Sequence, residues 1–468
     1  MKLGLSPAGE KIRRPAVAGM FYPADREALS RELSEMLEQS VEDAPAPAFP
    51  KIVIVPHAGY IYSGAVAASA YDRLAAARGI ATRVVLLGPA HRVHVRGLAL
   101  PGAAAFDTPL GRIPIDFAAV ESIRGFPQVV ESQQAHALEH SLEVQLPFLQ
   151  RVIGEFTLVP LVVGEATAEA VAQVIERLWG GPETLIVISS DLSHYLSYDE
   201  ATRIDAITAG AIVGFDTGIS HEQACGATPV AGALLVARRH GLNGRRLDLR
   251  NSGDTAGGKG RVVGYGSFAF SEGDTKFGSA HGRTLLGLAR AAIGAALGCN
   301  AAPVIEDELW LKIARATFVT LKMDGNLRGC IGSLEARRPL GEDVVANARA
   351  AALKDPRFSP LTRREFEAVD IEVSLLSAPR RVLFEDHADL VRRLRPGEDG
   401  VILECDGRRA TFLPQVWDAL PDPEQFLAHL KQKAEIPASV RTTRCTVLRY
   451  GALKWSEAQD GTRDSQQA

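Results

Sequence analysis

The chain has 468 residues, of which 46% are hydrophobic and 23% charged, and its formal net charge is −4. This length exceeds one ordinary core and predicts two or three domains. A slightly acidic chain lacks the basic field that attracts nucleic acid or an anionic membrane, so we expect neither as a partner. No apolar run reaches the roughly 18–20 residues of a membrane span.

Cysteine usage and the first residues indicate the cellular setting. The five cysteines are odd in number and widely spaced, which does not predict a disulfide framework. Residues 1–14 lack the continuous apolar core of a secretory signal. We therefore expect a reduced, cytoplasmic protein.

The first part of the chain alternates short apolar segments with helical patterns. A helix is expected at 25–38, and strands and helices then follow one another from 51 to 270. Continuous apolar strands separated by helices predict an α/β domain over 1–271, with a mixed or parallel central sheet covered by helices. The expected strands are 51–56, 83–88, 156–163, 185–190 and 262–270, and the expected helices are 64–78, 141–153, 167–179, 200–214 and 229–240.

The pattern changes after residue 271. Residues 272–281 are small and polar and predict a linker. The region 282–456 mixes strands and helices less regularly, so we expect an α+β domain with a largely antiparallel sheet. The polar tail 457–468 is expected to be disordered. In the second domain we expect a hairpin of 315–322 and 327–332, further strands at 369–377, 400–405, 408–413 and 444–450, and helices at 284–298, 341–353 and 423–434.

Histidine and cysteine side chains lie at element ends in the first domain. His57 and His91 each follow an apolar strand, and Cys225 precedes Thr228-Pro229, a pair typical of a helix start. Ligands gather outside the carboxyl ends of strands in open α/β sheets, and a helix start favours thiolate. Imidazole and thiolate suit iron, copper or zinc, and three protein ligands would leave coordination positions open for catalysis.

Two further polar side chains follow the expected strand 185–190. Asp191 and His194 are candidates for acid/base chemistry, or for an outer shell that orients a ligand or substrate. His140 could face the same cleft, or it or Ser141 could cap a helix in which Glu143 favours the dipole.

Structural roles compete with each of these assignments. A lone histidine after a strand is more often a hydrogen-bonded loop residue than a ligand, and a lone cysteine is more often a buried small hydrophobe. By their positions, His94 and His221 are expected to be surface loop residues. The coincidence of three strand ends and one helix start favours a site, but spacing alone does not show that these residues meet.

Residues about 12–271 resemble the Memo family, protein B of the AmmeMemoRadiSam system. The resemblance implies a fold like that of class III extradiol dioxygenases, a metal site at His57, His91 and Cys225, and a lining of Asp191 and His194, of which His194 corresponds to the acid/base histidine of the dioxygenases. The matching segments, in chain order, are Ala-Gly-Met-Phe-Tyr-Pro, Pro-His57-Ala-Gly-Tyr-Ile-Tyr-Ser-Gly, Leu-Gly-Pro-Ala-His91, Glu-His140-Ser-Leu-Glu143, Ser-Ser-Asp191-Leu-Ser-His194-Tyr and Cys225-Gly226.

One position departs from the dioxygenases and leaves several functions open. They bind Fe(II) through two histidines and a carboxylate, whereas here, as in other Memo proteins, Cys225 takes the third position. A thiolate shifts the preference toward softer metals, so we expect an iron or copper oxidoreductase, with zinc less favoured. The alternatives are a non-catalytic module that binds a peptide or small molecule in a relic dioxygenase cleft, and a zinc-assisted hydrolase.

In the second domain, a glycine on each side of Cys330 suggests a close backbone approach within a strand. A buried structural thiol is the favoured interpretation. The alternative places Arg328 and Cys330 in a cleft, with Arg357 opposite. Residues about 282–455 resemble the AMMECR family, protein A of the same system, through the segments Leu-Arg-Gly-Cys-Ile-Gly, Asp-Pro-Arg-Phe, Val-Asp-Ile-Glu-Val-Ser-Leu-Leu and Pro-Gly-Glu-Asp-Gly-Val-Ile-Leu.

The two resemblances together imply a fusion of components A and B of one system. The family context also implies a partner, a radical S-adenosylmethionine protein that carries an iron–sulfur cluster. This chain has no Cys-Xaa-Xaa-Cys or similar cluster sequence of its own. We therefore expect any such cluster to belong to the partner.

Overall fold

The computed structural model describes residues 11–40, 49–272, 277–299, 301–377, 379–382, 384–437 and 440–460. The chain divides into two compact units. Among the described residues, the first unit comprises 11–40 and 49–272, and the second comprises the residues from 277 onward. Each unit is described by itself.

A nine-stranded mixed sheet forms the centre of the first unit. Its four middle strands, β2, β9, β3 and β8, run parallel, while β12 and β4 flank them in the antiparallel direction. The order is β10-β12-β2-β9-β3-β8-β4-β7, and β11 pairs with β12. The strands are β2 (Ile52–Val55), β3 (Arg83–Pro89), β4 (Leu98–Leu100), β7 (Val129–Glu131), β8 (Thr157–Val163), β9 (Thr184–Ser189), β10 (His194–Leu196), β11 (Asn243–Asn251) and β12 (Val262–Ser271).

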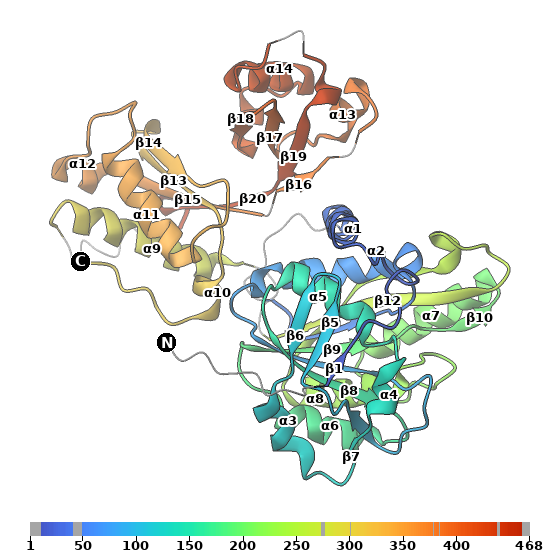
Figure 1. Ribbon diagram of the computed structural model, residues 1–468. Helices are drawn as coiled ribbons and strands as arrows, with labels where there is room; N and C mark the ends of the chain where they lie inside the picture. The colour runs from blue at the N-terminus through green and yellow to red at the C-terminus, as the bar shows by residue number, and fades with distance from the viewer. Residues whose placement is uncertain are drawn as a thin grey trace. The chain divides into compact units, whose positions relative to one another are not determined.

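Helices cover both faces of this sheet, which is why its middle strands are almost continuously apolar. In Figure 1, α1, α2 and α5 lie on one side of the sheet, and α3, α6 and α8 lie on the other. The predicted α/β class with a mixed central sheet is confirmed. The helices are α1 (Arg26–Gln39), α2 (Tyr60–Tyr71), α3 (Phe117–Arg124), α4 (Gln133–Ala137), α5 (Leu146–Val152), α6 (Ala168–Arg177), α7 (Tyr198–Val213) and α8 (Ala227–Arg239).

A small sheet adds the N-terminal segment to this unit. Its strands are β1 (Ile12–Arg13), β5 (Ala105–Thr108) and β6 (Gly111–Pro114), in the order β1-β5-β6. These short strands are absent from the sequence-based prediction, as is β11, whose charged residues obscure any apolar pattern. The continuous helix predicted at 141–153 is wrong. That region is a 3-10 turn (Glu143–Gln145) followed by α5, with Pro147 in the first turn of the helix.

The second unit contains two four-stranded antiparallel sheets, so the predicted α+β class is confirmed. Their orders are β14-β13-β15-β20 and β16-β19-β17-β18. The predicted hairpin turns at Asp324 and Gly325, both of which have positive φ, as the tight two-residue turn requires. The strands are β13 (Thr317–Met323), β14 (Asn326–Gly332), β15 (Asp370–Leu376), β16 (Arg380–Arg381), β17 (Gly400–Cys405), β18 (Arg408–Phe412), β19 (Thr446–Tyr450) and β20 (Ala452–Ser456).

Two boundaries of this unit differ from the prediction. Helix α9 begins at Ser279, inside the predicted linker 272–281, because Phe277 and the apolar face of the helix join the core. Helix α15 (Glu457–Asp460) occupies the start of the predicted disordered tail, where buried Glu457 pairs with Arg290. Residues 273–276 of the predicted linker and 461–468 of the predicted tail lie outside the described residues. The other helices are α9 (Ser279–Ala296), α10 (Leu309–Lys312), α11 (Leu340–Leu353), α12 (Arg363–Ala368), α13 (His387–Arg393) and α14 (Pro423–Lys433).

Within the part of the chain that the structure describes, no helix combines the length and the apolar character that crossing a membrane requires.

Candidate metal centre

The parallel strands bring three predicted site segments to one edge of the first sheet. His57 follows β2, His91 follows β3, and Asp191 follows β9. These strands are direct neighbours with parallel registers, for example Val55 opposite Ser189. Because parallel strands all end at the same edge, residues that are far apart in the sequence meet there.

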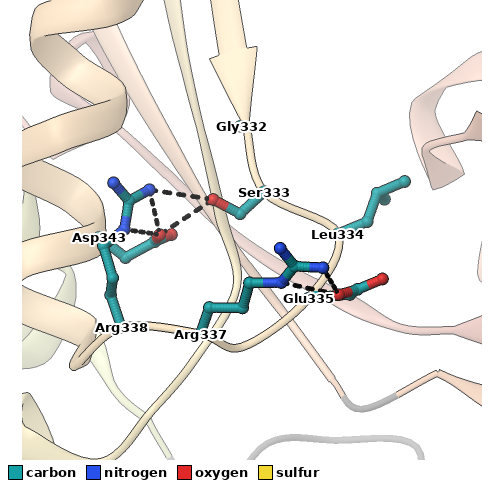
Figure 2. A pocket seen from close by; sticks show the side chains of 7 residues that line it. All are labelled: Gly332, Ser333, Leu334, Glu335, Arg337, Arg338 and Asp343. Carbon is teal, nitrogen blue, oxygen red and sulfur yellow. Dashed lines mark hydrogen bonds and ion pairs between the residues drawn. The ribbon is translucent and has the colours of Figure 1, made fainter.

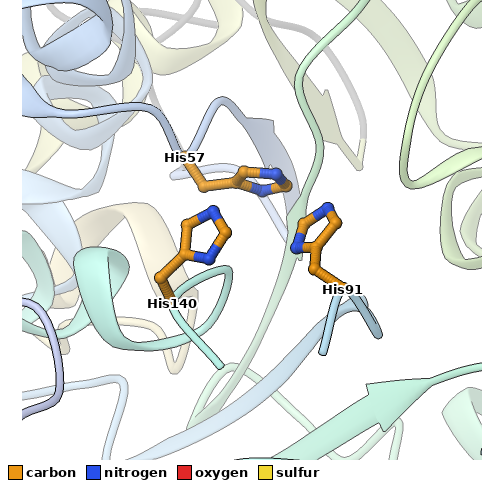
Figure 3. Close-up of side chains that lie close together, drawn as sticks. All are labelled: His57, His91 and His140. Carbon is orange, nitrogen blue, oxygen red and sulfur yellow. The ribbon is translucent and has the colours of Figure 1, made fainter. Parts of the chain in front are cut away.

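Three imidazoles form a compact cluster at this edge. The ring centroids of His57, His91 and His140 lie 4.9–5.5 Å apart, and their ligand nitrogen atoms all lie within 4.8 Å of one another (Figure 3). His140 comes from the loop between α4 and α5. The sequence predicts it as a catalytic candidate, whereas its position in the cluster also makes it a candidate ligand.

Hydrogen bonds fix the tautomer of His57. The Ser189 hydroxyl donates its only proton to the Ser141 carbonyl at 2.6 Å. Its oxygen must therefore accept from both neighbours, the Gln145 amide at 2.8 Å and His57 Nδ1 at 2.9 Å. Because Nδ1 carries the proton, Nε2 of neutral His57 carries the lone pair, and the thiol of Cys225 lies 3.3 Å from it.

His91 is held in the same tautomer by Glu139. Its Nδ1 lies 2.9 Å from Glu139 Oε1, and its backbone N–H donates to Oε2 at 2.7 Å. Burial alone would raise the pKa of Glu139, but the bond with His91 and the surrounding N–H donors lower it to about 2. A carboxylate can only accept, so His91 Nδ1 is the donor, and Nε2 of the neutral ring also keeps a free lone pair.

Burial keeps two of the three imidazoles uncharged at neutral pH. Together with the neighbouring imidazoles, it lowers the pKa of His57 well below its usual value. Burial also lowers the pKa of His140 to about 4, against the opposing effect of Glu139. His140 Nδ1 is 3.4 Å from Glu139 Oε1 but makes no hydrogen bond within the described residues, although it is buried. Neutral imidazoles with unused lone pairs are what a transition metal requires.

Cys225 lies beside this cluster. Its Sγ is 3.3 Å from His57 Nε2, yet the group whose ligand atoms all lie within 4.8 Å consists of the three histidines. Two expectations about Cys225 are corrected. The N-cap of α8 is Gly226 rather than Thr228, and burial, followed by the charge of Asp191, raises the pKa of the thiol to about 12 instead of favouring thiolate.

Asp191 and His194 lie close to His57 but differ in their roles. Buried Asp191 accepts a hydrogen bond from the His57 backbone N–H at 2.7 Å, and its Oδ2 is 4.0 Å from His57 Nε2. Burial raises the pKa of Asp191 to about 7 despite these backbone bonds. His194 Nδ1 donates to the Leu192 carbonyl at 2.8 Å, which leaves Nε2 free, and burial lowers its pKa. Asp191 can therefore exchange a proton near neutral pH, whereas burial favours the neutral form of His194.

A pocket of about 330 Å³ adjoins the cluster, and His91 and Cys225 form part of its wall. His94 and His221, predicted to be surface loop residues, also line it; His94 is nevertheless 63% exposed and pairs with Glu165 at 3.6 Å. No signal in the sequence indicates this placement, because it depends on how loops from different strands fold over the same edge.

A larger pocket, of about 540 Å³, lies in the second unit between β14 and α11. Its charged side chains are already paired, Arg338 with Asp343 and Arg337 with Glu335 (Figure 2). Its volume alone would favour this pocket as the functional site. Its charged side chains, however, are already paired with one another and offer no free ligand atoms. We therefore place the candidate site at the histidine cluster.

The structure brings together two of the three residues predicted for the cleft in the second unit. Arg357 donates to the Cys330 carbonyl at 3.2 Å, and Asp355 accepts from the Cys330 amide at 2.8 Å. Arg328 points elsewhere: it is buried and forms a two-pronged ion pair with Glu365 at 2.9 and 3.1 Å. Arg328 therefore contributes to the fold and leaves Cys330 and Arg357 as a smaller group.

Two residues that support the cluster, Glu139 and Ser189, are missing from the sequence-based prediction, and the role predicted for Glu143 is wrong. Glu139 directly precedes His140, and Ser189 ends a strand, so both lie inside recognised segments. Glu143 is predicted to favour a helix dipole, whereas it is fully buried and binds Arg13, Tyr22 and the backbone of the N-terminal segment. The signal in the sequence that could have indicated Glu139 is its position next to a candidate histidine. The role of Glu143 depends on contacts with residues more than 100 positions away, which the sequence does not indicate.

Fold and site together define an α/β protein with a candidate metal centre at the carboxyl edge of its central sheet, joined to an α+β unit. Residues 13–269 match the family described as Memo-like protein, and residues 286–455 match AMMECR1. The chain belongs to the Memo family and carries an AMMECR1 region after it, so both resemblances are confirmed.

Two MEMO1 family proteins agree with this assignment. A MEMO1 family protein of Aquifex aeolicus is 39% identical over 269 residues, which cover 54% of this chain and 97% of the relative. A MEMO1 family protein of Ignicoccus hospitalis is 35% identical, covering 55% and 98%. A solved structure, an uncharacterized protein from Pyrococcus horikoshii, is 30% identical with a TM-score of 0.34, covering 37% of this chain and 90% of that one.

Proposed function

We propose that the first unit binds one iron or copper ion and acts as a metal-dependent oxidoreductase on a small molecule. The observation that carries this proposal is the fixed tautomer of His57 and His91, which puts the proton of each ring on Nδ1 and keeps Nε2 for an ion beside the neutral imidazole of His140. The buried Nδ1 of His140, which makes no hydrogen bond among the described residues, supports it further. In this proposal His57 and His91 hold the ion, and Cys225 or His140 completes the donor set.

A bound iron or copper ion would supply one-electron chemistry that no side chain provides. The chain itself supplies position and protons. Asp191 orients the loop of His57 through the backbone and holds a proton near neutral pH. His194 presents a free Nε2 that accepts a proton from a substrate. The pocket of about 330 Å³ limits the substrate to a small molecule or a single peptide side chain.

A second candidate function follows from His140. Three imidazoles without the thiol form the donor set that zinc uses when it activates water. In that case Cys225 would remain a buried thiol and the site would support hydrolysis.

Metal analysis distinguishes these functions. The full chain is purified anaerobically under reducing conditions, and its metals are quantified in wild type, His57→Ala, His140→Ala and Cys225→Ser. About one equivalent of iron or copper, lost in His57→Ala, is expected. Less than about a tenth of an equivalent in wild type would falsify the proposal, and activity restored by zinc alone would favour the hydrolase. His94→Ala is the matched control, because His94 lines the pocket outside the cluster.

The third ligand is identified in the same experiment. If Cys225 completes the site, Cys225→Ser loses metal and the thiolate-to-metal absorption band. If His140 does so, His140→Ala loses metal while Cys225→Ser keeps it.

We also propose, from family context, that the protein works with a radical S-adenosylmethionine protein of the AmmeMemoRadiSam system. The expected result is co-purification of the two proteins from a host that contains both, with activity that depends on both. Separate elution and independent activities would contradict this partnership.

A further inference from the structure

We propose that Glu139 is a positioning residue that sets the metal affinity of the first unit by holding His91; this inference rests on the metal site proposed above. The Glu139 side chain is 1% exposed. Its Oε1 accepts from His91 Nδ1 at 2.9 Å and from the backbone N–H groups of His140 and Ser141 at 3.0 Å each. Its Oε2 accepts from the backbone N–H of His91 at 2.7 Å.

These bonds join two segments that both carry imidazoles. One carboxylate oxygen holds the ring of His91, the other holds its backbone, and the loop of His140 closes over the same group. Outer hydrogen bonds of this kind fix ring orientation and raise ligand basicity. Glu139 therefore prepares His91 to bind through Nε2 before any ion arrives.

The two histidines respond differently to Glu139. Oε1 already accepts from three donors, and His140 Nδ1, at 3.4 Å, makes no hydrogen bond with it. The ring of His91 is thus locked, while the tautomer of His140 stays free to follow the ion. Replacing Glu139 should consequently disturb the binding contribution of His91 more than that of His140.

Substitution by glutamine tests this role with a minimal change in size. Both carboxylate oxygens of Glu139 face N–H donors, so either orientation of the new amide in Glu139→Gln would turn its NH₂ group toward another donor. Two donors that face each other in a buried site cannot be satisfied. His91 then either shifts its backbone or loses its fixed tautomer.

Glu143 offers a matched control four residues along the chain. It is also a fully buried glutamate, but it binds Arg13, Tyr22 and the backbone of the N-terminal segment instead of an imidazole. Glu143→Gln should therefore reduce stability while the folded protein keeps its affinity for metal. The comparison separates a general effect of losing a buried carboxylate from an effect on the site.

The experiment titrates chelator-treated full-length protein with Co²⁺ and follows the visible d–d absorption, with thermal unfolding recorded for each variant. The expected result is an affinity about 10–100-fold weaker for Glu139→Gln, with a changed absorption band, and an unchanged affinity and band for Glu143→Gln. Wild-type affinity and spectrum in Glu139→Gln would overturn the inference but leave the proposed metal site standing. No binding by wild type would overturn both.

A second variant covers the case in which Glu139→Gln does not fold. Glu139→Asp keeps the charge but draws the carboxylate back by one methylene, so His91 Nδ1 and the backbone of His140 cannot both be reached. We expect weaker Co²⁺ binding than in wild type and an altered band. Binding equal to that of wild type in folded Glu139→Asp would count against the positioning role.

Discussion

Two groups of side chains resemble binding sites in the sequence: the histidine cluster of the first unit, and Cys330, Asp355 and Arg357 in the second. They differ in how many of their polar atoms already have a hydrogen-bond or ion-pair partner. His57 and His91 carry their protons on Nδ1, which keeps Nε2 of each ring as a ligand atom, and Nδ1 of His140 makes no hydrogen bond within the described part of the chain. In the second unit, the charge of Asp355 is met by Arg357 and by two backbone N–H groups. Unused ligand atoms mark a candidate binding site, whereas complete pairing indicates a structural role.

An ion pair outside the cluster joins the N-terminal strand to the rest of the first unit. Arg13, from the short N-terminal strand β1, pairs with Glu143 and donates to the carbonyls of His136 and Glu139 at 3.1 and 2.7 Å. Arg13 thereby fixes the backbone that precedes His140, whereas Glu143, its ion-pair partner, touches no imidazole ring of the cluster.

The largest effect is expected when this outer support is broken. Arg13→Ala leaves Glu143 as a buried carboxylate without its cation, and we expect a loss of about 3–5 kcal/mol in the free energy of unfolding. Urea unfolding measures the loss. The adjacent exposed Arg14 is the control, because Arg14→Ala should change stability by less than about 0.5 kcal/mol. Equal effects of the two substitutions would show that the buried pair stabilises the fold no more than an exposed arginine does.

The parts of the site that depend on local pattern could be predicted from the sequence. His57 and His91 follow strands with clear apolar runs, and parallel strands must end at one edge. Glu139 and Arg13 could not be predicted in the same way, because their partners are set by how a loop and a distant strand pack together. The pKa of Cys225 is predicted in the wrong direction for a related reason, since burial outweighs the helix start.

The second prediction concerns acid, and it uses a buried histidine beside the cluster. His136 Nε2 lies 2.7 Å from the Ala99 carbonyl; a carbonyl only accepts, so Nε2 is the donor. Burial lowers the pKa of His136 to about 4 against this favourable bond. The unfolded chain, with an ordinary histidine pKa near 6.5, then binds more protons than the folded chain between about pH 6.5 and pH 4.

Stability should therefore be full above about pH 6.5 and fall as the pH decreases toward 4. His136 alone accounts for about 3 kcal/mol of this fall, since each pKa unit corresponds to about 1.4 kcal/mol. His136→Gln keeps a donor for the Ala99 carbonyl but cannot titrate. Between about pH 6.5 and pH 4, the free energy of unfolding of this variant should therefore fall by about 3 kcal/mol less than that of wild type. Parallel urea unfolding curves at about pH 7.5 and 4.5 check the difference; identical falls in both proteins would refute the assignment to His136.

The smallest effect is expected in the second unit. This prediction tests whether the fully paired side chains there have only a structural role. The Arg357 side chain is 54% exposed, and Asp355 keeps the N–H groups of Cys330 and Arg357 when the guanidinium is removed. Solvent screening limits the energy of such a pair, so Arg357→Ala should lower the free energy of unfolding in urea by less than about 1 kcal/mol.

Arg328→Ala is the matched comparison. Its side chain is only 11% exposed and binds Glu365 through two nitrogens, so the loss should be larger. If Arg357→Ala cost as much as Arg328→Ala, the exposed arginine would be a structural support of Cys330. A small cost would show that Asp355, through the backbone N–H groups of Cys330 and Arg357, holds this group in place, and that the ion pair with Arg357 adds little to the stability of the unit.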